Sequence, residues 1–540
     1  MMKKLLSCLL LAAVLLAGYC FAAAEGNALV SRYYTVGGET EEGPDFEYEL
    51  LPDGSARIVY CAYVKSGLVI PETVDGFPVS ELGERSVPEG LGLLRVAIPD
   101  CVTTICPNAF GNVYCVVRPE VSDTHPTLKV VDGVLICPGE KRIIRGEISG
   151  EYRIPEGIEA IDDYAFGGCH PKSVYIPESV ASLGRNPFAL CNANMDTYNA
   201  LQEVTLSPYN TALEIRDGAL FSKADRRLVW CFAPDYTLGE HPQYEIPDGT
   251  EVIDDFALTR WRLLESVTIP ASVTRIGANP FYGMRYPQGI RLADGNDAFV
   301  IADGMLISRA DRRIVFGLCS AGRVTVPEGT EIIGDYAFVT NTVQDSFVYL
   351  PDSVKEIGTR AFYSSDVRIP SGVRIIRDYA FANGMVKELP VFDGGVVIGD
   401  SAFGGCTWIS SLTVNGGAKI RAYAFSGCLG LEEVSVSGPS RIGPGAFASC
   451  GKLRTVNLGE GVKELGNGAF MMCDRLEEIS LPASLEWIGV NTLLNGADRQ
   501  YNEQFDTYMV IYRSTAHVTV PGGSYAERYC VDNEVNYTAR

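Results

Sequence analysis

The sequence predicts a β-rich repeat solenoid built from units of about 22–24 residues, because one six-residue segment, I-x-x-x-A-F, recurs at that spacing. Its closing Phe residues between positions 381 and 470 are 22, 22, 22 and 23 residues apart. One apolar, strand-like run per period in the twenties is the pattern of stacked units that share a core. We call this segment the box. Its five regular copies are IRDYAF, IGDSAF, IRAYAF, IGPGAF and LGNGAF (376–381, 398–403, 420–425, 442–447 and 465–470).

Weaker boxes extend the repeat in both directions, to 14 copies in all. They end at Val87, Phe110, Phe166, Phe188, Leu258, Phe281, Phe338, Phe362 and Leu493. A second phrase, V-x-I-P, lies between boxes, as at Val174–Pro177 and Val267–Pro270. Alternating β-branched residues followed by Pro predict a short strand that stops there, since Pro has no amide hydrogen to donate. We therefore expect about 14 rungs along a quasi-linear axis of roughly 65 Å, at ~4.8 Å per strand.

Together the two phrases, L-x-x-V-x-I-P-x-S-V-x-x-I-G-x-x-A-F-x-x-C, closely resemble the BspA-like (Treponema-type) leucine-rich repeats of bacterial surface and secreted proteins. The resemblance covers roughly Phe46 to the C-terminus. It implies a right-handed leucine-rich-repeat superhelix with a strand-lined face, and a role in adhesion or protein binding. It implies no particular ligand, because that family is defined by its repeat and not by a shared chemistry.

Residues 1–24 are expected to form a secretory signal peptide, with Lys3 and Lys4, an apolar run from Leu5 to Ala17, and small residues before Glu25. Cys20 raises a lipoprotein alternative, but Tyr19 stands where a small residue is required. We expect a secreted or cell-surface monomer with no visible anchor and no membrane span. The net charge of −22 becomes −24 once the two lysines are removed, which argues against nucleic acid and anionic membranes as partners.

The predicted organisation is a flexible segment at 25–43 and a single solenoid at 44–540. Residues 44–80 form the N-terminal cap, a hairpin around Asp53-Gly54. Repeats occupy 81–494, with hairpin modules near 128–150, 211–232 and 296–318, each centred on an Asp-Gly pair. Residues 495–540 form the C-terminal cap: a loop at 495–507, strands at 509–512 and 518–521, and a helix capped by Ser524 with Glu527.

Cysteine and aspartate recur in phase with the repeat, which favours structural roles. Six cysteines lie three residues after the closing box residue and predict a reduced, inward-facing ladder, although export leaves one or two disulfides open. The cysteines are Cys169, Cys191, Cys406, Cys428, Cys450 and Cys473. The box aspartates are expected to bond their own backbone, with calcium ligation or a hydrolase carboxylate pair as alternatives. These aspartates are Asp162, Asp163, Asp254, Asp255, Asp335, Asp378 and Asp400. No catalytic residues, metal site or cofactor are predicted.

The residue x of V-x-I-P must point away from the core, because side chains alternate along a strand. This outward row is mostly small and hydroxylated, with two Tyr and one Arg. The candidate binding residues are Tyr175, Thr268, Thr325, Tyr349, Arg368 and Asn457. Such a row suits an extended partner, either a protein or a cell-surface glycan. The sequence thus favours a non-catalytic binding or adhesion protein, with a structural spacer or matrix component, or a secreted hydrolase, as alternatives.

Overall fold

The computed structural model describes residues 34–35, 45–61, 67–87, 92–111, 115–189, 203–232, 243–259, 261, 264–284, 289–317, 322–338, 346–362, 366–493, 495–502 and 507–540. Within these ranges the chain is a β-solenoid of about 17 turns with a spacing of ~23 residues. The predicted signal peptide and Cys191 lie outside the described residues, as does the predicted flexible segment except for the strand β1 (Tyr34–Thr35).

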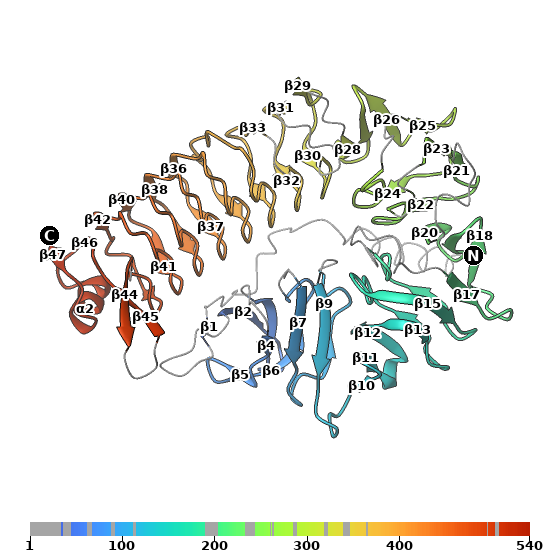
Figure 1. Cartoon of the computed structure of the whole chain (residues 1–540), viewed down its shortest axis with the longest axis horizontal. Helices are drawn as coiled ribbons and strands as arrows, with labels where there is room; N and C mark the ends of the chain where they lie inside the picture. The colour runs from blue at the N-terminus through green and yellow to red at the C-terminus, as the bar shows by residue number, and fades with distance from the viewer. Residues whose placement is uncertain are drawn as a thin grey trace.

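Each turn contributes one strand that leads into the box, and these box strands pair in parallel. They form one side of the solenoid and, in its C-terminal half, the inner rim (Figure 1). The box strands are β3 (Ala56–Cys61), β6 (Phe77–Leu82), β8 (Thr104–Ile105), β12 (Arg142–Gly146), β14 (Ala160–Ile161), β16 (Ser182–Leu183), β20 (Arg227–Cys231), β22 (Val252–Ile253), β24 (Arg275–Ile276), β28 (Arg313–Gly317), β30 (Ile332–Ile333), β32 (Glu356–Ile357), β34 (Ile375–Ile376), β35 (Val396–Ile398), β37 (Ala418–Ile420), β39 (Ser440–Ile442), β41 (Val462–Leu465) and β43 (Trp487–Ile488).

The V-x-I-P segments form the opposite side, as five separate parallel sheets. We call these the outer strands. They are β4 (Gly67–Val69), β7 (Gly92–Ala97) and β9 (Cys115–Glu120); β13 (Ser149–Arg153), β15 (His170–Ile176) and β17 (Glu203–Leu206); β21 (Gln243–Glu245), β23 (Ser266–Ile269) and β25 (Ile290–Leu292); β29 (Gly322–Thr325), β31 (Ser346–Tyr349) and β33 (Asp366–Arg368); and β36 (Ser411–Val414), β38 (Glu433–Val436), β40 (Thr455–Leu458), β42 (Glu478–Ser480), β46 (His517–Val520) and β47 (Tyr537–Ala539).

The core between the two sides is filled by residues that repeat in phase. Box phenylalanines stack face to face from Phe338 to Phe470, with ring centroids 4.9–5.6 Å apart and planes within 12° of parallel. The described ladder cysteines are buried, and each thiol donates to a backbone carbonyl oxygen of the preceding rung, at 3.0–3.2 Å. This arrangement confirms the inward ladder at Cys169, Cys406, Cys428, Cys450 and Cys473.

The box itself is a tight turn that bonds to the next rung. The backbone N–H groups of Tyr379 and Phe381 donate to the carbonyl oxygens of Asp400 and Ala402, at 2.8 Å each. Tyr379 has φ +57°, in the left-handed region, which costs energy for a residue with a side chain. Gly445 takes the same place in a later box with φ +57°. The repeated inter-rung bonds stabilise this strained turn.

Each of the three modules is an antiparallel meander whose third strand is a box strand. The added strands are β10 (Lys129–Val131), β11 (Val134–Cys137), β18 (Leu213–Arg216), β19 (Ala219–Ser222), β26 (Phe299–Ala302) and β27 (Met305–Ser308), and a 3-10 turn, η1 (Pro138–Glu140), lies in the first module. The Asp-Gly pairs, such as Asp132-Gly133, have positive φ at both residues and form the expected hairpin turns. Because each module supplies a rung of its own, the solenoid has more turns than the 14 boxes predicted.

At every module the ladder of box strands breaks, and an arginine side chain bridges the break. The first residue of β12, β20 and β28 is an arginine whose guanidinium donates to the carbonyl oxygen that ends the preceding box strand. The donor–acceptor pairs are Arg142 to Ile105 at 2.9 Å, Arg227 to Leu183 at 2.6 Å and Arg313 to Ile276 at 3.0 Å. The modules are therefore joints between four stacks of box strands.

At two of these joints a hydrogen bond connects the box turns on either side of the module. The fully buried Asn186 donates from Nδ2 to the carbonyl oxygen of Asp255 at 2.7 Å, and Asn279 donates to that of Tyr336 at 2.7 Å. In both cases the bond joins the last box before the module to the first box after it, past the box strand that the module supplies. Outer sheets are interrupted at the same places, so the solenoid bends there (Figure 1). The predicted quasi-linear axis is wrong, because the joints turn the chain through an arc.

The arc brings the N-terminal cap against the C-terminal repeats (Figure 1). The cap sheet contains β2 (Asp45–Leu50), which forms the predicted hairpin with β3, and β5 (Thr73–Val74). The Tyr60 hydroxyl donates to Asp400 Oδ1, and Lys419 Nζ lies 2.6 Å from Glu47 Oε2. The Arg421 guanidinium lies 4.3 Å from the centre of the Tyr60 ring. We call this contact between Glu47, Tyr60, Asp400, Lys419 and Arg421 the clasp.

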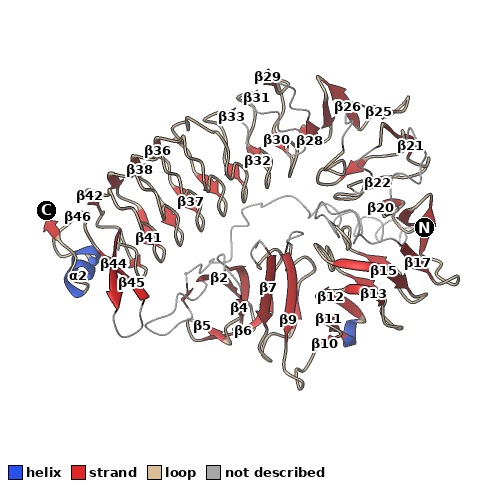
Figure 2. Cartoon of the chain, in the orientation of Figure 1, coloured by secondary structure: helices blue, strands red, loops and turns tan. Residues whose placement is uncertain are grey.

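The C-terminal cap differs from the prediction in two elements, β44 (Gly496–Asn502) and the unpredicted strand β47, which pairs in parallel with β46. The strands β44 and β45 (Thr507–Arg513) pair antiparallel, and β44 lies where a loop was expected over 495–507 (Figure 2). The predicted helix is present as α2 (Tyr525–Asp532). Ser524 accepts from the Glu527 N–H at 3.1 Å, and Glu527 accepts from the Gly523 N–H at 2.6 Å, as in a capping box. Within the described residues, no helix is long and apolar enough to cross a membrane.

Candidate recognition surface

The candidate binding residues all lie on outer strands, but the structure distributes them over four sheets. Tyr175 is on β15, Thr268 on β23 and Asn457 on β40. Thr325, Tyr349 and Arg368 are brought together, because they are direct register partners on β29, β31 and β33. The continuous row expected from the sequence is therefore a set of short rows separated by the joints.

Because side chains alternate along a strand, the residue two positions before each candidate binding residue also points outward. On β29 and β31 these residues are Arg323 and Phe347, which are also register partners. The Phe347 and Tyr349 rings are 4.4 Å apart at 54°. The Arg323 guanidinium lies 3.8 Å from the centre of the Tyr349 ring, close enough for a cation–π contact. Sequence reasoning missed Arg323 and Phe347, although the same two-residue alternation identifies them.

A similar contact occurs on β13 and β15, where the Arg153 guanidinium lies 3.8 Å from the centre of the Tyr175 ring. Both tyrosines are half-buried, and both arginines are exposed. Stacking on an aromatic ring restrains an arginine side chain while its N–H groups still point outward. Each pair is thus a restrained hydrogen-bond donor on the outer face.

The box aspartates serve the solenoid itself. Asp378 Oδ1 accepts from the Asp400 N–H at 2.8 Å, and Asp163 Oδ1 accepts from the Arg185 N–H at 2.7 Å. The expectation that the box aspartates bond their own backbone holds for Asp254, which accepts from the Asp255 N–H at 3.2 Å. It is wrong for the aspartates that accept from a backbone N–H of the next rung, which are Asp163, Asp255, Asp335, Asp378 and Asp400. Among the described residues no group of three or more His, Cys, Asp or Glu is arranged to hold a metal ion.

Two further aspartates are buried at the joints. Asp162 forms an ion pair with Arg142, and Asp254 pairs with Arg227 at 2.6 Å. Burial raises the pKa of Asp162 to about 7, against the opposing effect of Arg142. Burial likewise raises the pKa of Asp254, and Arg227 opposes the change. Because these carboxyls pair with the arginines that bridge the joints, we assign them a structural role in holding adjacent stacks of box strands together.

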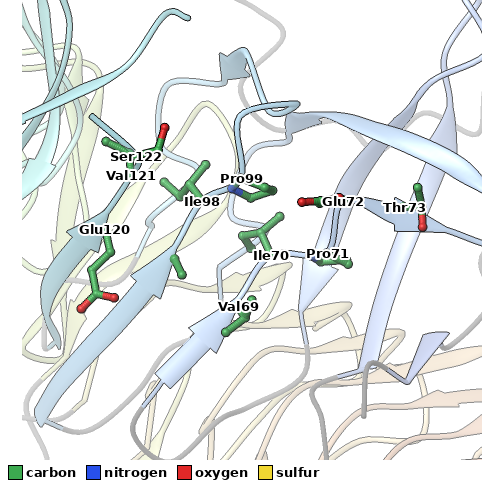
Figure 3. A pocket seen from close by; sticks show the side chains of 11 residues that line it. Val69, Ile70, Pro71, Glu72, Thr73, Ile98, Pro99, Glu120, Val121 and Ser122 are labelled. Carbon is green, nitrogen blue, oxygen red and sulfur yellow. The ribbon is translucent and has the colours of Figure 1, made fainter. Parts of the chain in front are cut away.

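A shallow cavity of about 530 Å³ lies where β4, β7 and β9 end (Figure 3). Its lining includes Val69, Ile70, Pro99 and Glu120, and Val69 is 59% exposed. The lining also holds two carboxylates and two hydroxyls, those of Glu72, Glu120, Thr73 and Ser122. The cavity therefore offers a mixed contact surface, with an apolar floor and polar groups at its edge.

No curated protein matches the chain. Among solved structures, the pneumococcal vaccine antigen PcpA is 14% identical, with a TM-score of 0.28, over 94% of this chain and 99% of that one. A leucine-rich cell-surface protein of Faecalibacterium prausnitzii is 21% identical, with a TM-score of 0.29, over 79% and 94%. A leucine-rich repeat protein of Bacteroides ovatus is 16% identical, with a TM-score of 0.24, over 82% and 98%. At these TM-scores the likeness carries no argument about shape or function.

The comparison with family models identifies the family of this chain, because the matching model describes the repeat itself. The model of the BspA-type leucine-rich repeat region matches six copies, at residues 149–211, 237–297, 312–432 and 396–498. These ranges cover more than half of the chain and include the five regular boxes, together with Asn186, Asn279 and the residues that accept their hydrogen bonds. The chain belongs to the BspA-type leucine-rich repeat family.

Proposed function

We propose that this chain is a non-catalytic binding or adhesion protein, exported to the cell surface or the medium, whose outer strands contact a protein or a cell-surface glycan. The observation that carries the proposal is the cluster on β29, β31 and β33. There Tyr349 lies between Thr325 and Arg368 in register and under the guanidinium of Arg323. Tyr and Arg are enriched in recognition surfaces, since they supply contact area together with hydrogen-bond donors.

Several framework features support a non-catalytic role. The buried carboxyls Asp162 and Asp254 pair with bridging arginines, and the described ladder thiols donate to backbone oxygens. These groups therefore have structural partners that account for their burial. The outer face, in contrast, carries outward side chains that the framework does not use. A binding role needs only such a face, held rigid by the stacked rungs beneath it.

The test is retention of the labelled protein on host cells, bacterial cells, and arrays of matrix proteins and glycans. A Tyr175→Ala, Tyr349→Ala, Arg368→Ala variant should be retained at least tenfold less than the unmodified chain. The matched control changes Thr413 and Thr519 to Ala, which are outward residues on β36 and β46. Thermal unfolding midpoints of all three proteins must agree within a few degrees.

Equal retention of the triple variant and the unmodified chain would remove this site and leave a structural spacer as the better account. Hydrolysis of a glycan or peptide substrate, lost in an Asp162→Asn, Asp163→Asn variant that still folds, would replace the binding proposal with a secreted hydrolase. Loss of retention in the Thr413, Thr519 control would place the contact elsewhere on the outer face.

A further inference from the structure

The sheet of β29, β31 and β33 differs from the other outer sheets in its charge. Its outward residues are Arg323, Thr325, Phe347, Tyr349, Asp366 and Arg368. Asp366, the one carboxylate among them, is 9% exposed and lies 2.6 Å from Lys387 Nζ. Arg323 and Arg368 are both exposed, and neither has a carboxylate partner among the described ion pairs. The sheet therefore presents a positive surface.

Every other outer sheet carries at least one exposed outward glutamate, within the described residues. The glutamates are Glu120 on β9, Glu151 on β13, Glu203 on β17, Glu245 on β21, and Glu433 on β38. The whole chain has a net charge of −22. Arg95 and Arg118, the outward arginines of β7 and β9, pair with Glu120 and Glu147. Arg323 and Arg368 have no such partner among the described ion pairs, so they attract anionic groups that the acidic surface around them repels.

The geometry of this surface suits a carboxylate-bearing chain. Arg368 is the direct neighbour of Tyr349 on one side, and Arg323 stacks on the Tyr349 ring from the strand on the other side. The backbones of β29 and β33 are two strand spacings apart, about 10 Å. That distance matches about three residues of an extended peptide, at ~3.3 Å per residue. Arginine forks bind carboxylates by two parallel hydrogen bonds.

The aromatic contacts distinguish a peptide from a sugar. Sugar rings bind aromatic side chains by stacking on an open ring face, but Arg323 covers one face of Tyr349 at 3.8 Å. Phe347 packs against the same ring at 4.4 Å. What the cluster offers is therefore guanidinium N–H groups, the edges of two rings and a threonine hydroxyl. These are contacts for carboxylate side chains and a peptide backbone.

We infer that the outer sheet of β29, β31 and β33 binds an acidic, extended polypeptide segment, whose carboxylates pair with Arg323 and Arg368 across Tyr349. This inference rests on the proposed function and specifies its ligand class. Lys387, whose side chain is 63% exposed, pairs with Asp366 and so neutralises the one carboxylate of this sheet. The binding is electrostatic and therefore weakens as salt rises.

The test is fluorescence anisotropy of a fluorescein-labelled octaglutamate peptide at about 50 mM salt. The full chain should bind it, and an Arg323→Gln, Arg368→Gln variant should bind at least tenfold more weakly. The matched control is Arg291→Gln, an exposed outward arginine on β25, which should bind within twofold of the unmodified chain. An octaglutamine peptide should not bind, and 500 mM salt should abolish binding of octaglutamate.

Equal binding by the double variant, or equal binding of octaglutamine, overturns the inference. A polygalacturonate oligosaccharide that binds more tightly than octaglutamate, with the same dependence on Arg323 and Arg368, also overturns it and assigns an acidic glycan instead. Where octaglutamate fails to bind but cell retention still depends on Tyr349 and Arg368, the ligand class is wrong and the proposed binding function stands. If octaglutamate does not bind and cell retention does not depend on Tyr349 and Arg368, the ligand class and the proposed binding site are both wrong.

Discussion

The hydroxyl of Tyr60 donates a hydrogen bond to the carboxylate of Asp400, a residue 340 positions further along the chain. In a straight solenoid each rung contacts only its neighbours, so these two residues would be far apart. Here the joints bend the chain until its N-terminal cap rests on the box strands β35 and β37. The ends of the solenoid are thus coupled by side chains.

Opening the clasp should lengthen the molecule. A Glu47→Gln, Tyr60→Phe variant removes the partner of Lys419 and the donor to Asp400, and Glu47 is only 4% exposed. We expect a loss of about 2–4 kcal/mol in the free energy of unfolding, since removing one partner of a buried pair leaves the other charge uncompensated. Small-angle scattering should show a larger maximum dimension. Glu49→Gln removes a half-buried carboxylate of the same strand that pairs with Arg57 at 3.6 Å within the cap, so it should leave the maximum dimension unchanged. An unchanged scattering profile in the clasp variant would contradict this role.

The joints should depend on their buried asparagines. Replacing Asn186 or Asn279 with Ala deletes the 2.7 Å bond across the joint and leaves a backbone carbonyl without its donor. Each change should cost about 1–3 kcal/mol in urea unfolding. Asn415→Ala, which removes an exposed bond to Asp393 at 2.8 Å, should cost less than about 0.5 kcal/mol. Equal costs at the buried and exposed sites would show that the joints gain nothing from these bonds.

Stability should fall as pH rises from about 4 to 7. Burial, opposed by Arg142, raises the pKa of Asp162 from 3.8 to about 7. A group whose folded pKa is raised contributes stability below its unfolded pKa, and that contribution is lost as pH rises through the folded pKa. At about 1.4 kcal/mol per pH unit, the loss is on the order of 2–4 kcal/mol.

Urea unfolding of the unmodified chain and of Asp162→Asn at several pH values measures this loss. The asparagine variant should have a flatter profile between pH 4 and 7, whatever its absolute stability, since the amide does not titrate. Parallel profiles for the two proteins would mean that Asp162 is ionised throughout this range in the folded state.

The ladder thiols should resist alkylation in the folded protein. Burial raises the pKa of Cys406 to about 12 and that of Cys428 well above its usual value, so little thiolate exists at pH 8. Iodoacetamide followed by peptide mass spectrometry should label both only after unfolding in urea. Cys101, which is half-buried, should react sooner in the folded protein. Rapid labelling of Cys428 without denaturant would contradict the buried ladder.

The local structure of the solenoid follows from the sequence because each rung is set by short-range rules. The box spacing, the Pro that ends each outer strand, the Asp-Gly turns of the modules and the Ser524 cap of α2 all act within a few residues. The phase of the repeat also determined which side chains face the core, including Phe425 and Cys428. Strand alternation likewise placed Tyr349 and Arg368 on the outer face.

The bend of the solenoid and the grouping of the surface residues were decided by tertiary structure. Arg227 bridges to Leu183 and Asn186 bonds to Asp255, over separations of 44 and 69 residues, and neither contact has a local sequence rule. The strand β44 was missed because its polar sequence lacks the alternation of a half-buried strand, whereas its partner β45 contains the strand expected at 509–512. Small angles at the joints add up along the chain, so closure at Tyr60 and Asp400 depends on packing at every joint. Repeat phase fixes each rung, whereas the relation between distant rungs depends on the side chains packed between them.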